Sequence, residues 1–579
     1  MTTDPVEEPD AVPRDPLRPP DTVARLRRMG CLHQTRLSFV RALTRRMARE
    51  GWRIERDVFD IGADEVGHAR YAVHTPQGRY SFVVFADRID PQARTDRVIA
   101  EEWDYTFALV EGVPDDADMA RLRANVPKQE AGRMCARDLV LSRGNKSARL
   151  FDHVVDALAR GRQPALAQIA KVGYLMRTTA VYGNGKFGLA DFDKLRRQGA
   201  FPQPFSAQML TVFLAREFSL DLVEALARTR DPQRATRLLP ELRRTLGVGN
   251  ATGLGMAPFL VSHPQLLHRW QWARETAIAR VKALPQAEPQ TRRRFATLLH
   301  RACSYAQDWC TDDARQQRRV ETLRQELATL CAELSPDGGD AALPEPHPWR
   351  RLCDMAAERF GVETQELLHS LILEPYPELV DELAEHMCAA EDERLQPGMR
   401  VDDLIALLET HYAWALAIDD RGADAATAYF WYRSEAKEEP RLGERCCESG
   451  ADREMPLGIG VQVRRLYREL GALDAAQRRE PVAALLLRRP EWRATVRRVQ
   501  TLADQPYAEV RDNLLDADMV PVDLLRFKLS FFGASKFDPK SDRWTRITLF
   551  QGAPTAEDLA DPAVDPDDWA FPVLPRDAE

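Results

Sequence analysis

The sequence predicts a mainly α, multi-domain protein with a small N-terminal α+β antiparallel-sheet domain, two helical regions and a C-terminal β-hairpin. Three observations lead to this prediction. The chain has 579 residues, which is too long for a single hydrophobic core. Apolar residues recur at helical spacing over most of its length. Alternation of apolar and polar residues, which is typical of strands, occurs near the two ends.

Changes in composition divide the chain into segments. The clearest division is the stretch SPDGGDAALPEPHP, which has the Pro, Gly and Asp content of a linker. We expect a disordered tail (1–24), an α+β domain (25–113), a helical domain with Gly/Asn loops (114–334), a linker (335–348), a second helical domain (349–520), a β-hairpin (521–553) and an acidic tail (554–579).

The elements of the first two domains follow from periodicity. Residues 69–73 and 80–84 alternate between apolar and polar, and the segment 75–78, Thr-Pro-Gln-Gly, has the Pro and Gly positions of a turn. Residues 105–109 form a further alternating run. Ser206 opens a helix with almost no polar face in its first turns, which is typical of a buried central helix.

Composition also bears on location and partners. The net charge of −8 argues against a protein that works by broad neutralisation of phosphates. No apolar run approaches the ~20 residues that a membrane span needs, and the acidic, proline-rich start lacks the pattern of a secretory signal. The nine cysteines are scattered without a C-x-x-C pair, which favours reduced thiols and a cytoplasmic, soluble protein.

Three segments rich in glycine and asparagine stand out in the first helical domain: 143–147, 182–188 and 247–255. Glycine lets backbone N–H groups approach a ligand closely, and the N-terminus of a helix favours an anion. If the three segments converge, they form a pocket for a carboxylate or a phosphate. Each also has a purely structural interpretation, because Gly247 suits a helix C-cap and Ser147 a helix N-cap.

The expected site draws on these segments and on an aromatic run that ends at Arg433. Lys186 or Tyr182 is the expected proton-transfer group, with His263 as a general base. The expected substrate-binding residues are Arg143, Asn145, Lys146, Asn184, Gly249, Asn250, Thr252 and Arg433. No metal site is expected, since the sequence has no H-E-x-x-H motif and no paired Glu-x-x-His motifs.

Two nucleotide-binding motifs are rejected. The segment 247–255 contains G-x-G-x-x-x-G, but the residues before it are predicted to be helical, whereas the dinucleotide fingerprint follows a strand. No Gly-Lys-Ser/Thr follows, so it is not a P-loop.

The preferred function is therefore an enzyme of small-molecule metabolism that binds an anionic substrate or cofactor. The alternative is a non-catalytic helical scaffold or regulatory protein, favoured by the long charged helices around 292–333. A third reading is nucleic-acid binding by the basic, aromatic segment 526–546. The sequence does not determine the reaction, the cofactor or the oligomeric state.

Overall fold

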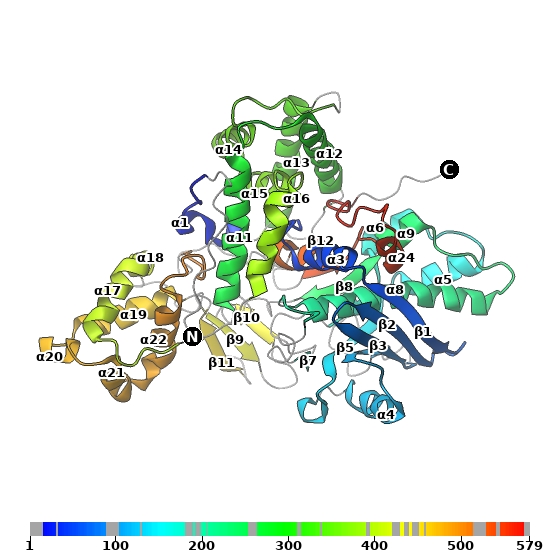
Figure 1. Ribbon diagram of the computed structural model, residues 1–579, viewed down its shortest axis with the longest axis horizontal. Helices are drawn as coiled ribbons and strands as arrows, with labels where there is room; N and C mark the ends of the chain where they lie inside the picture. The colour runs from blue at the N-terminus through cyan, green and yellow to red at the C-terminus, as the bar shows by residue number, and fades with distance from the viewer. Residues whose placement is uncertain are drawn as a thin grey trace.

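The structure is a computed structural model with a mixed α/β architecture around one large sheet (Figure 1). Among the residues that it describes, no helix has both the length and the apolarity that a membrane span requires. These residues are 15–29, 33–88, 103–127, 130–179, 189–190, 199–203, 205–252, 263–307, 309, 314–335, 339–388, 394–419, 429–433, 439–442, 451–456, 459–512, 529–539 and 545–572.

The large sheet has ten strands in the order β1-β2-β3-β4-β5-β6-β8-β13-β12, and β7 pairs with β5. Neighbouring strands are antiparallel except β6 and β8, which are parallel. The strands are β1 Arg53–Ile61, β2 Gly67–Thr75, β3 Gly78–Ala86, β4 Tyr105–Glu111, β5 Asp138–Lys146, β6 Tyr174–Thr178, β7 Leu189–Ala190, β8 Gly247–Thr252, β12 Ala534–Pro539 and β13 Thr545–Leu549.

This sheet contradicts the predicted fold class, mainly α with a small N-terminal sheet. The N-terminal strands and the C-terminal hairpin belong to one sheet, because β13 pairs with β8. Two segments that were read as loops between helices are strands: 143–146 lies in β5 and 247–252 forms β8. The protein is therefore a mixed α/β fold.

The glycines of β8 explain why this strand was missed. A Cβ added at Gly249 would lie 2.7 Å from the Tyr174 ring, and one at Gly247 would lie 2.4 Å from the carbonyl oxygen of Leu549. Glycine inside a strand marks such close approach of neighbouring groups. The strand therefore lacks the alternating side chains on which strand prediction depends.

The predicted turn at 75–78 is confirmed. Thr75 pairs with Gly78 at the end of the β2–β3 hairpin, and the Thr75 hydroxyl accepts a hydrogen bond from the Gln77 N–H at 3.2 Å. The C-terminal hairpin has different bounds from those predicted. Leu529–Gly533 is a short π-helical turn, η6, and the first strand of the hairpin, β12, starts only at Ala534.

Helices cover both faces of the sheet. The long helix α8 is buried along most of its length, as its apolar start predicted, and packs with α5 against one face. Helix α4 covers the other face through a separate apolar cluster. The helices that precede α11 in the chain, together with α24, are α1 Pro20–Val23, α2 Leu26–Met29, α3 Phe39–Arg49, α4 Asp116–Asn125, α5 Phe151–Ala159, α6 Leu166–Val172, α8 Ser206–Arg230, α9 Pro240–Thr245 and α24 Ala556–Ala560, with the 3-10 turn η2 at Ala131–Arg133.

A second group of helices stands beside the sheet (Figure 1). It shares the main hydrophobic cluster with the sheet, and Ala341 and Leu343, within the predicted linker at 335–348, pack into that cluster. The helices are α11 Pro264–Lys282, α12 Pro289–Gln307, α13 Ala314–Leu334, α14 Pro348–Arg359, α15 Val362–Leu371, α16 Pro377–Val380 and the 3-10 helix η3 Asp381–Cys388.

The helices within 401–502 have a hydrophobic cluster of their own. We call them the helical module. Its helices are α17 Val401–His411, α18 Ala413–Leu416, α19 Gly460–Gly471, α20 Ala475–Arg478, α21 Val482–Arg488, the 3-10 turn η5 Pro490–Trp492 and α22 Arg493–Leu502. A three-stranded sheet in the order β10-β9-β11 has the strands β9 Tyr429–Arg433, β10 Glu439–Leu442 and β11 Ala451–Pro456.

The sequence predicted that all cysteines are reduced thiols, and the structure differs from this prediction at one pair. Cys303 of α12 and Cys331 of α13 form a disulfide, whereas Cys353 is a buried free thiol. The paired cysteines are 28 positions apart and meet only because the two helices pack side by side. Their spacing in the sequence could not indicate this contact.

Residues after α22 connect the helical module to α11. The Tyr507 N–H donates to Nδ1 of His268 at 3.2 Å, and the two rings are stacked with their centroids 5.8 Å apart. Burial, with a smaller contribution from Arg269, lowers the pKa of His268 from its usual 6.5 to about 4. The imidazole is therefore neutral in the folded protein at neutral pH.

We expect this histidine to make the protein acid-sensitive. Between pH 6.5 and about 4 the unfolded chain binds a proton at His268 that the folded chain does not, so stability falls as the pH falls through that window. The full loss is about 3 kcal/mol, from about 1.4 kcal/mol for each pKa unit. Urea unfolding at several pH values should show it.

His268→Asn is the matched variant, because the Asn side chain puts an amide oxygen near the position of Nδ1, where it can accept from the Tyr507 N–H, and does not titrate. Its unfolding free energy should depend less on pH than that of the wild type between pH 6.5 and 4. Parallel curves for the two proteins would show that His268 is not responsible.

Candidate functional site

A cavity of about 940 Å³ opens between α3, α12, the residues after α15 and the segment after α24. We call it the arginine cavity. Its lining carries both signs of charge. The charged residues that line it are Arg36, Arg45, Arg46, Arg49, Arg293, Arg294, Glu374, Glu378, Asp381, Glu385, Asp565 and Asp567.

Helix α3 supplies the innermost cations. It spans Phe39–Arg49, and Gly51, in the left-handed conformation with φ 62°, follows its end. Arg41, Arg45 and Arg49 are spaced four residues apart, so they share one side of the helix. Val40, Leu43 and other apolar residues of α3 pack into the main hydrophobic cluster. The packing of this apolar side fixes where the arginine side points.

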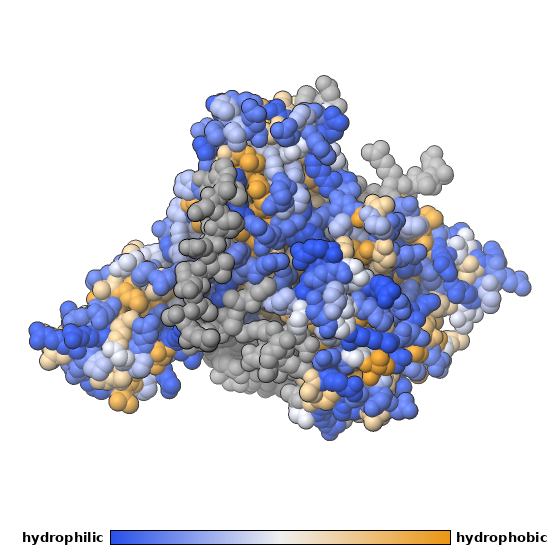
Figure 2. All heavy atoms as spheres, in the orientation of Figure 1, coloured by the Kyte–Doolittle hydropathy of each residue, from blue (hydrophilic) through white to orange (hydrophobic). Residues whose placement is uncertain are grey.

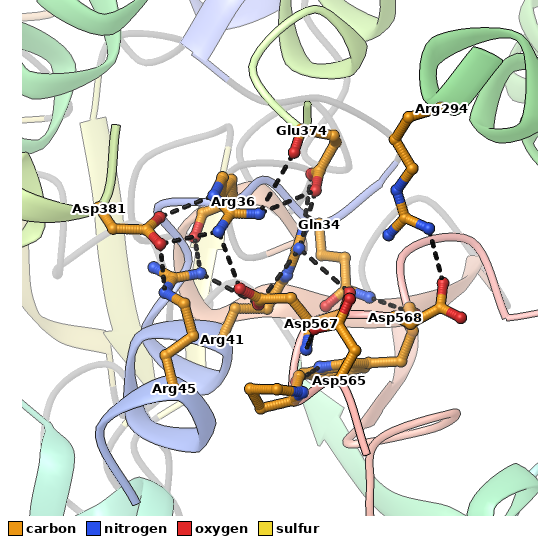
Figure 3. Close-up of polar contacts among 12 residues, drawn as sticks. Gln34, Arg36, Arg41, Arg45, Arg294, Glu374, Asp381, Asp565, Asp567 and Asp568 are labelled. Atoms are coloured by element: carbon orange, nitrogen blue, oxygen red, sulfur yellow. Dashed lines mark hydrogen bonds and ion pairs between the residues drawn. The ribbon is translucent and has the colours of Figure 1, made fainter. Parts of the chain in front are cut away.

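Three carboxylates face these arginines (Figure 3). Arg41 is fully buried and binds Glu374, with one N–O distance of 2.8 Å. Arg36 binds Asp381 at 2.6 Å and Asp567 at 2.9 Å. Although burial opposes its ionisation, Arg45, Arg41 and Arg36 together hold the pKa of Asp567 well below its usual value. Asp567 is therefore charged at neutral pH, close to all three arginines.

Arg45 differs from the other two arginines. Its Nη1 donates to the Arg36 carbonyl at 3.0 Å and contacts Asp567 at 3.2 Å. In the described part of the chain its Nη2 is buried and has no hydrogen-bond partner. Burial lowers the pKa of Arg45. Arg36 and Arg41 are buried as well, but the carboxylates that pair with them raise their pKa values. Nε of Arg45 lies 3.5 Å from Asp381. Arg41 also has a buried nitrogen without a partner, Nε, but Arg41 does not line the cavity, whereas Arg45 does.

The remaining charged residues are nearer the rim. Arg49 and Glu385 are mostly exposed and 3.9 Å apart. Arg293 pairs with Asp340 and Arg294 with Asp568. A ligand that enters would therefore meet paired, solvated charges first and the unused donor of Arg45 further in.

The residues predicted on β5 lie in the sheet rather than in a loop. Arg143 and Asn145 share one face, and Lys146 is on the other, since side chains alternate along a strand. The Asn145 side chain accepts from the Asp104 N–H, and the Lys146 ammonium pairs with Glu65. Arg143 lies over the Trp103 ring, and burial lowers its pKa. Arg143 and Lys146 therefore do not converge.

The structure does bring two of the predicted segments together. Asn145 of β5 pairs with Arg177 of β6, and Arg177 pairs with Gly249 of β8, so the three positions form a row across the sheet. Asn250 and Thr252 follow in β8, opposite Ile547 and Thr545 of β13. Arg177, which was not predicted, lies between the two segments; only the pairing of strands reveals it.

Several predicted residues are elsewhere or outside the described residues. Tyr182, Asn184 and Lys186 lie outside them, as do most of the basic residues of 526–546. His263 precedes α11 and contacts the Phe205 ring edge-on, with centroids 6.3 Å apart. Arg433 ends β9 in the three-stranded sheet. The structure does not test the proposed roles of these residues.

Sequence reasoning missed the arginine cavity altogether. Its arginines belong to the stretch RLSFVRALTRRMAR, in which Arg41 stands between apolar residues in the first turn of α3 and is fully buried. An arginine at a core position needs a buried partner, and that was the available signal. The partners Glu374 and Asp567 are 333 and 526 positions away. No local pattern could identify them.

The comparisons with known proteins give no match: no family model fits the sequence, and neither a curated protein nor a solved structure is significantly similar to the chain. Among the described residues, no group of three or more His, Cys, Asp or Glu side chains could hold a metal ion. Function must therefore be argued from the geometry of the cavities.

Proposed function

We propose that the protein binds a small molecule with a carboxylate or phosphate group in the arginine cavity. The observation that carries the proposal is the buried Nη2 of Arg45, which has no hydrogen-bond partner in the described part of the chain. A buried donor without a partner costs about 1–3 kcal/mol, and a turn of the Arg45 side chain toward an anionic oxygen in the cavity would remove that cost. Charge-assisted bonds from arginine to such oxygens are among the strong ones.

The size of the cavity agrees with this class of ligand. About 940 Å³ is at the upper end of the range for sites that bind small molecules. The acidic residues at its rim, Glu378 and Glu385, favour a ligand that also carries a polar or cationic part. The class of ligand is the one expected from the sequence, an anionic metabolite, but the proposed site is the arginine cavity instead of the glycine- and asparagine-rich segments. The proposal assigns no reaction.

Arg45→Gln tests the proposal. We expect the wild-type protein to gain thermal stability with a phosphate- or carboxylate-bearing ligand from a metabolite library, by about 2.7 kcal/mol at a ligand concentration of 100 Kd. The variant should bind that ligand at least about tenfold more weakly, for a loss of about 1.4 kcal/mol. Isothermal titration measures the difference directly.

Two further variants separate binding from folding. Arg45→Lys keeps the charge beside Asp567 and loses the planar donor fork, so binding should fall while stability changes less. Arg293→Gln is the matched control, because this arginine is exposed at the rim and paired with Asp340. If Arg45→Gln, still folded by circular dichroism, binds the ligand as tightly as the wild type, the proposal is wrong.

A non-catalytic helical scaffold or regulatory protein, the alternative considered above, has less support. Figure 2 shows that the described residues on this face are mostly hydrophilic, with apolar residues in separate patches. Stable protein interfaces have an apolar centre, and the apolar residues in this view lie in separate patches instead of one continuous area. We therefore favour the small-molecule site.

A further inference from the structure

The lining of the arginine cavity is almost entirely polar. None of the described residues that line it is aromatic, and the apolar ones are all small: Ala42, Ala48, Pro375, Pro377, Ala384 and Pro566. Sites that hold flat or apolar molecules are lined mainly by hydrophobic and aromatic side chains. The described part of the cavity therefore offers no surface on which a nucleobase or another aromatic ring could stack.

The charges that line the cavity balance one another. Six arginines and six carboxylates line it, and Arg36 pairs with Asp381 at 2.6 Å and with Asp567 at 2.9 Å. Like charges placed side by side are strongly unfavourable. A ligand with a chain of phosphates would bring several negative charges beside these carboxylates, so the balance favours a ligand with a single anionic group.

Hydrogen-bonding groups without an ionic partner line the rest of the cavity. Gln290, in the first turn of α12, is exposed, and so is Glu378, which forms no ion pair among the described residues. The Gln203 amide N–H donates to a backbone carbonyl at 3.3 Å, and the Thr297 hydroxyl donates to another at 3.0 Å, which leaves their oxygens able to accept. Donors and acceptors are thus mixed, and a hydroxyl group, which both donates and accepts, suits such a lining.

We propose that the ligand of the arginine cavity is a polyhydroxylated molecule with one anionic group, such as a sugar monophosphate or a sugar acid. This inference rests on the proposed function, because it takes the anionic group to bind beside Arg45. The hydroxyls then bind the amides and carboxylates of the lining. A volume of about 940 Å³ holds one such molecule together with bridging water.

Isothermal titration of the full-length protein with matched anions tests this inference. Glucose 6-phosphate and gluconate combine hydroxyls with one anionic group. Cyclohexylmethyl phosphate and hexanoate are their counterparts without hydroxyls. At least one hydroxylated anion should bind at least about tenfold more tightly than its counterpart, because its hydroxyls together make several hydrogen bonds. The anion that does so identifies the anionic group as a phosphate or a carboxylate.

Gln290→Ala gives a second readout that does not depend on folding, since this side chain is exposed. The variant should bind the preferred hydroxylated anion about three- to tenfold more weakly, from the loss of one hydrogen bond, and its hydroxyl-free counterpart as before. Gln325→Ala is the matched control, because Gln325 is an exposed glutamine of the neighbouring helix α13 that does not line the cavity. It should leave both affinities unchanged.

The outcomes separate this inference from the proposed function. If the hydroxyl-free anions bind as tightly as the hydroxylated ones and Arg45→Gln weakens both, the ligand is not polyhydroxylated, but the anion site stands. If Arg45→Gln leaves the binding of every anion unchanged, both the site and this inference are wrong. If neither glucose 6-phosphate nor gluconate binds saturably at millimolar concentration, this inference is wrong, and the metabolite library decides on the proposed function.

Discussion

Replacing Arg216 by Met should lower the free energy of unfolding by about 4 kcal/mol or more. Arg216 lies in α8, is fully buried, and donates to the carbonyl oxygens of Leu246, Ala553 and Pro554 at 2.7–3.0 Å and to two further carbonyls in α9. Burial lowers its pKa to about 10, so it remains charged at neutral pH. Met fills the space but removes the donors that these carbonyls receive from Arg216, although the Arg244 carbonyl keeps the Gly552 N–H at 2.7 Å.

The matched control for this prediction is Arg230→Gln in the same helix. Arg230 is 40% exposed and pairs with Asp156, and exposed pairs contribute about 1 kcal/mol or less. Arg216→Lys should fall between the two, because it keeps the charge and loses the fork that reaches several carbonyls. Urea unfolding followed by circular dichroism compares all three. A loss below about 1 kcal/mol in Arg216→Met would show that the carbonyls find other donors.

Glu374→Gln is the second substitution with a large expected effect, about 3–5 kcal/mol. Glu374 is 3% exposed and binds Arg41, which has no exposed surface. Gln keeps the shape and removes the charge, so Arg41 is left with Asp567 at 3.3 Å as its remaining carboxylate partner. The desolvation cost of a buried cation is then only partly offset.

Comparison with Glu385→Gln isolates the effect of burial. Glu385 lines the same cavity but is 68% exposed, so its loss should change stability by less than about 1 kcal/mol. A double variant, Glu374→Gln with Arg41→Met, should recover part of the loss, because it removes the unpaired cation as well. If the double variant is no more stable than Glu374→Gln, the ion pair is not the source of the effect.

What the sequence could predict depended on how local the signal was. The turn at 75–78 and the buried helix from Ser206 follow from spacing within a few residues, and both were predicted. Strand β8 was not, because close packing against Tyr174 demands glycine where a strand usually shows alternating side chains. The fold class was wrong mainly because β5 and β8 were read as loops, although they lie between the N-terminal strands and the C-terminal hairpin.

The candidate site was harder to predict than the fold. Sequence reasoning looked for glycine loops and single charged residues near one another. The arginine cavity instead combines α3 with carboxylates from positions 374, 381 and 567, which only the tertiary structure brings together. The class of ligand, an anion, stays a prediction, now attached to Arg45 rather than to Lys186.

The position of β13 beside β8 has a consequence for synthesis on the ribosome. Strands β1 to β6 can pair as they leave the exit tunnel, but the far edge of β8 has no partner until residues 545–549 have been made, some 300 positions later. Asp567, which faces Arg36 and also Arg41 and Arg45 of α3, arrives later still. A nascent chain therefore carries an open sheet edge and uncompensated buried cations for most of its translation, a state in which chaperones would be most needed.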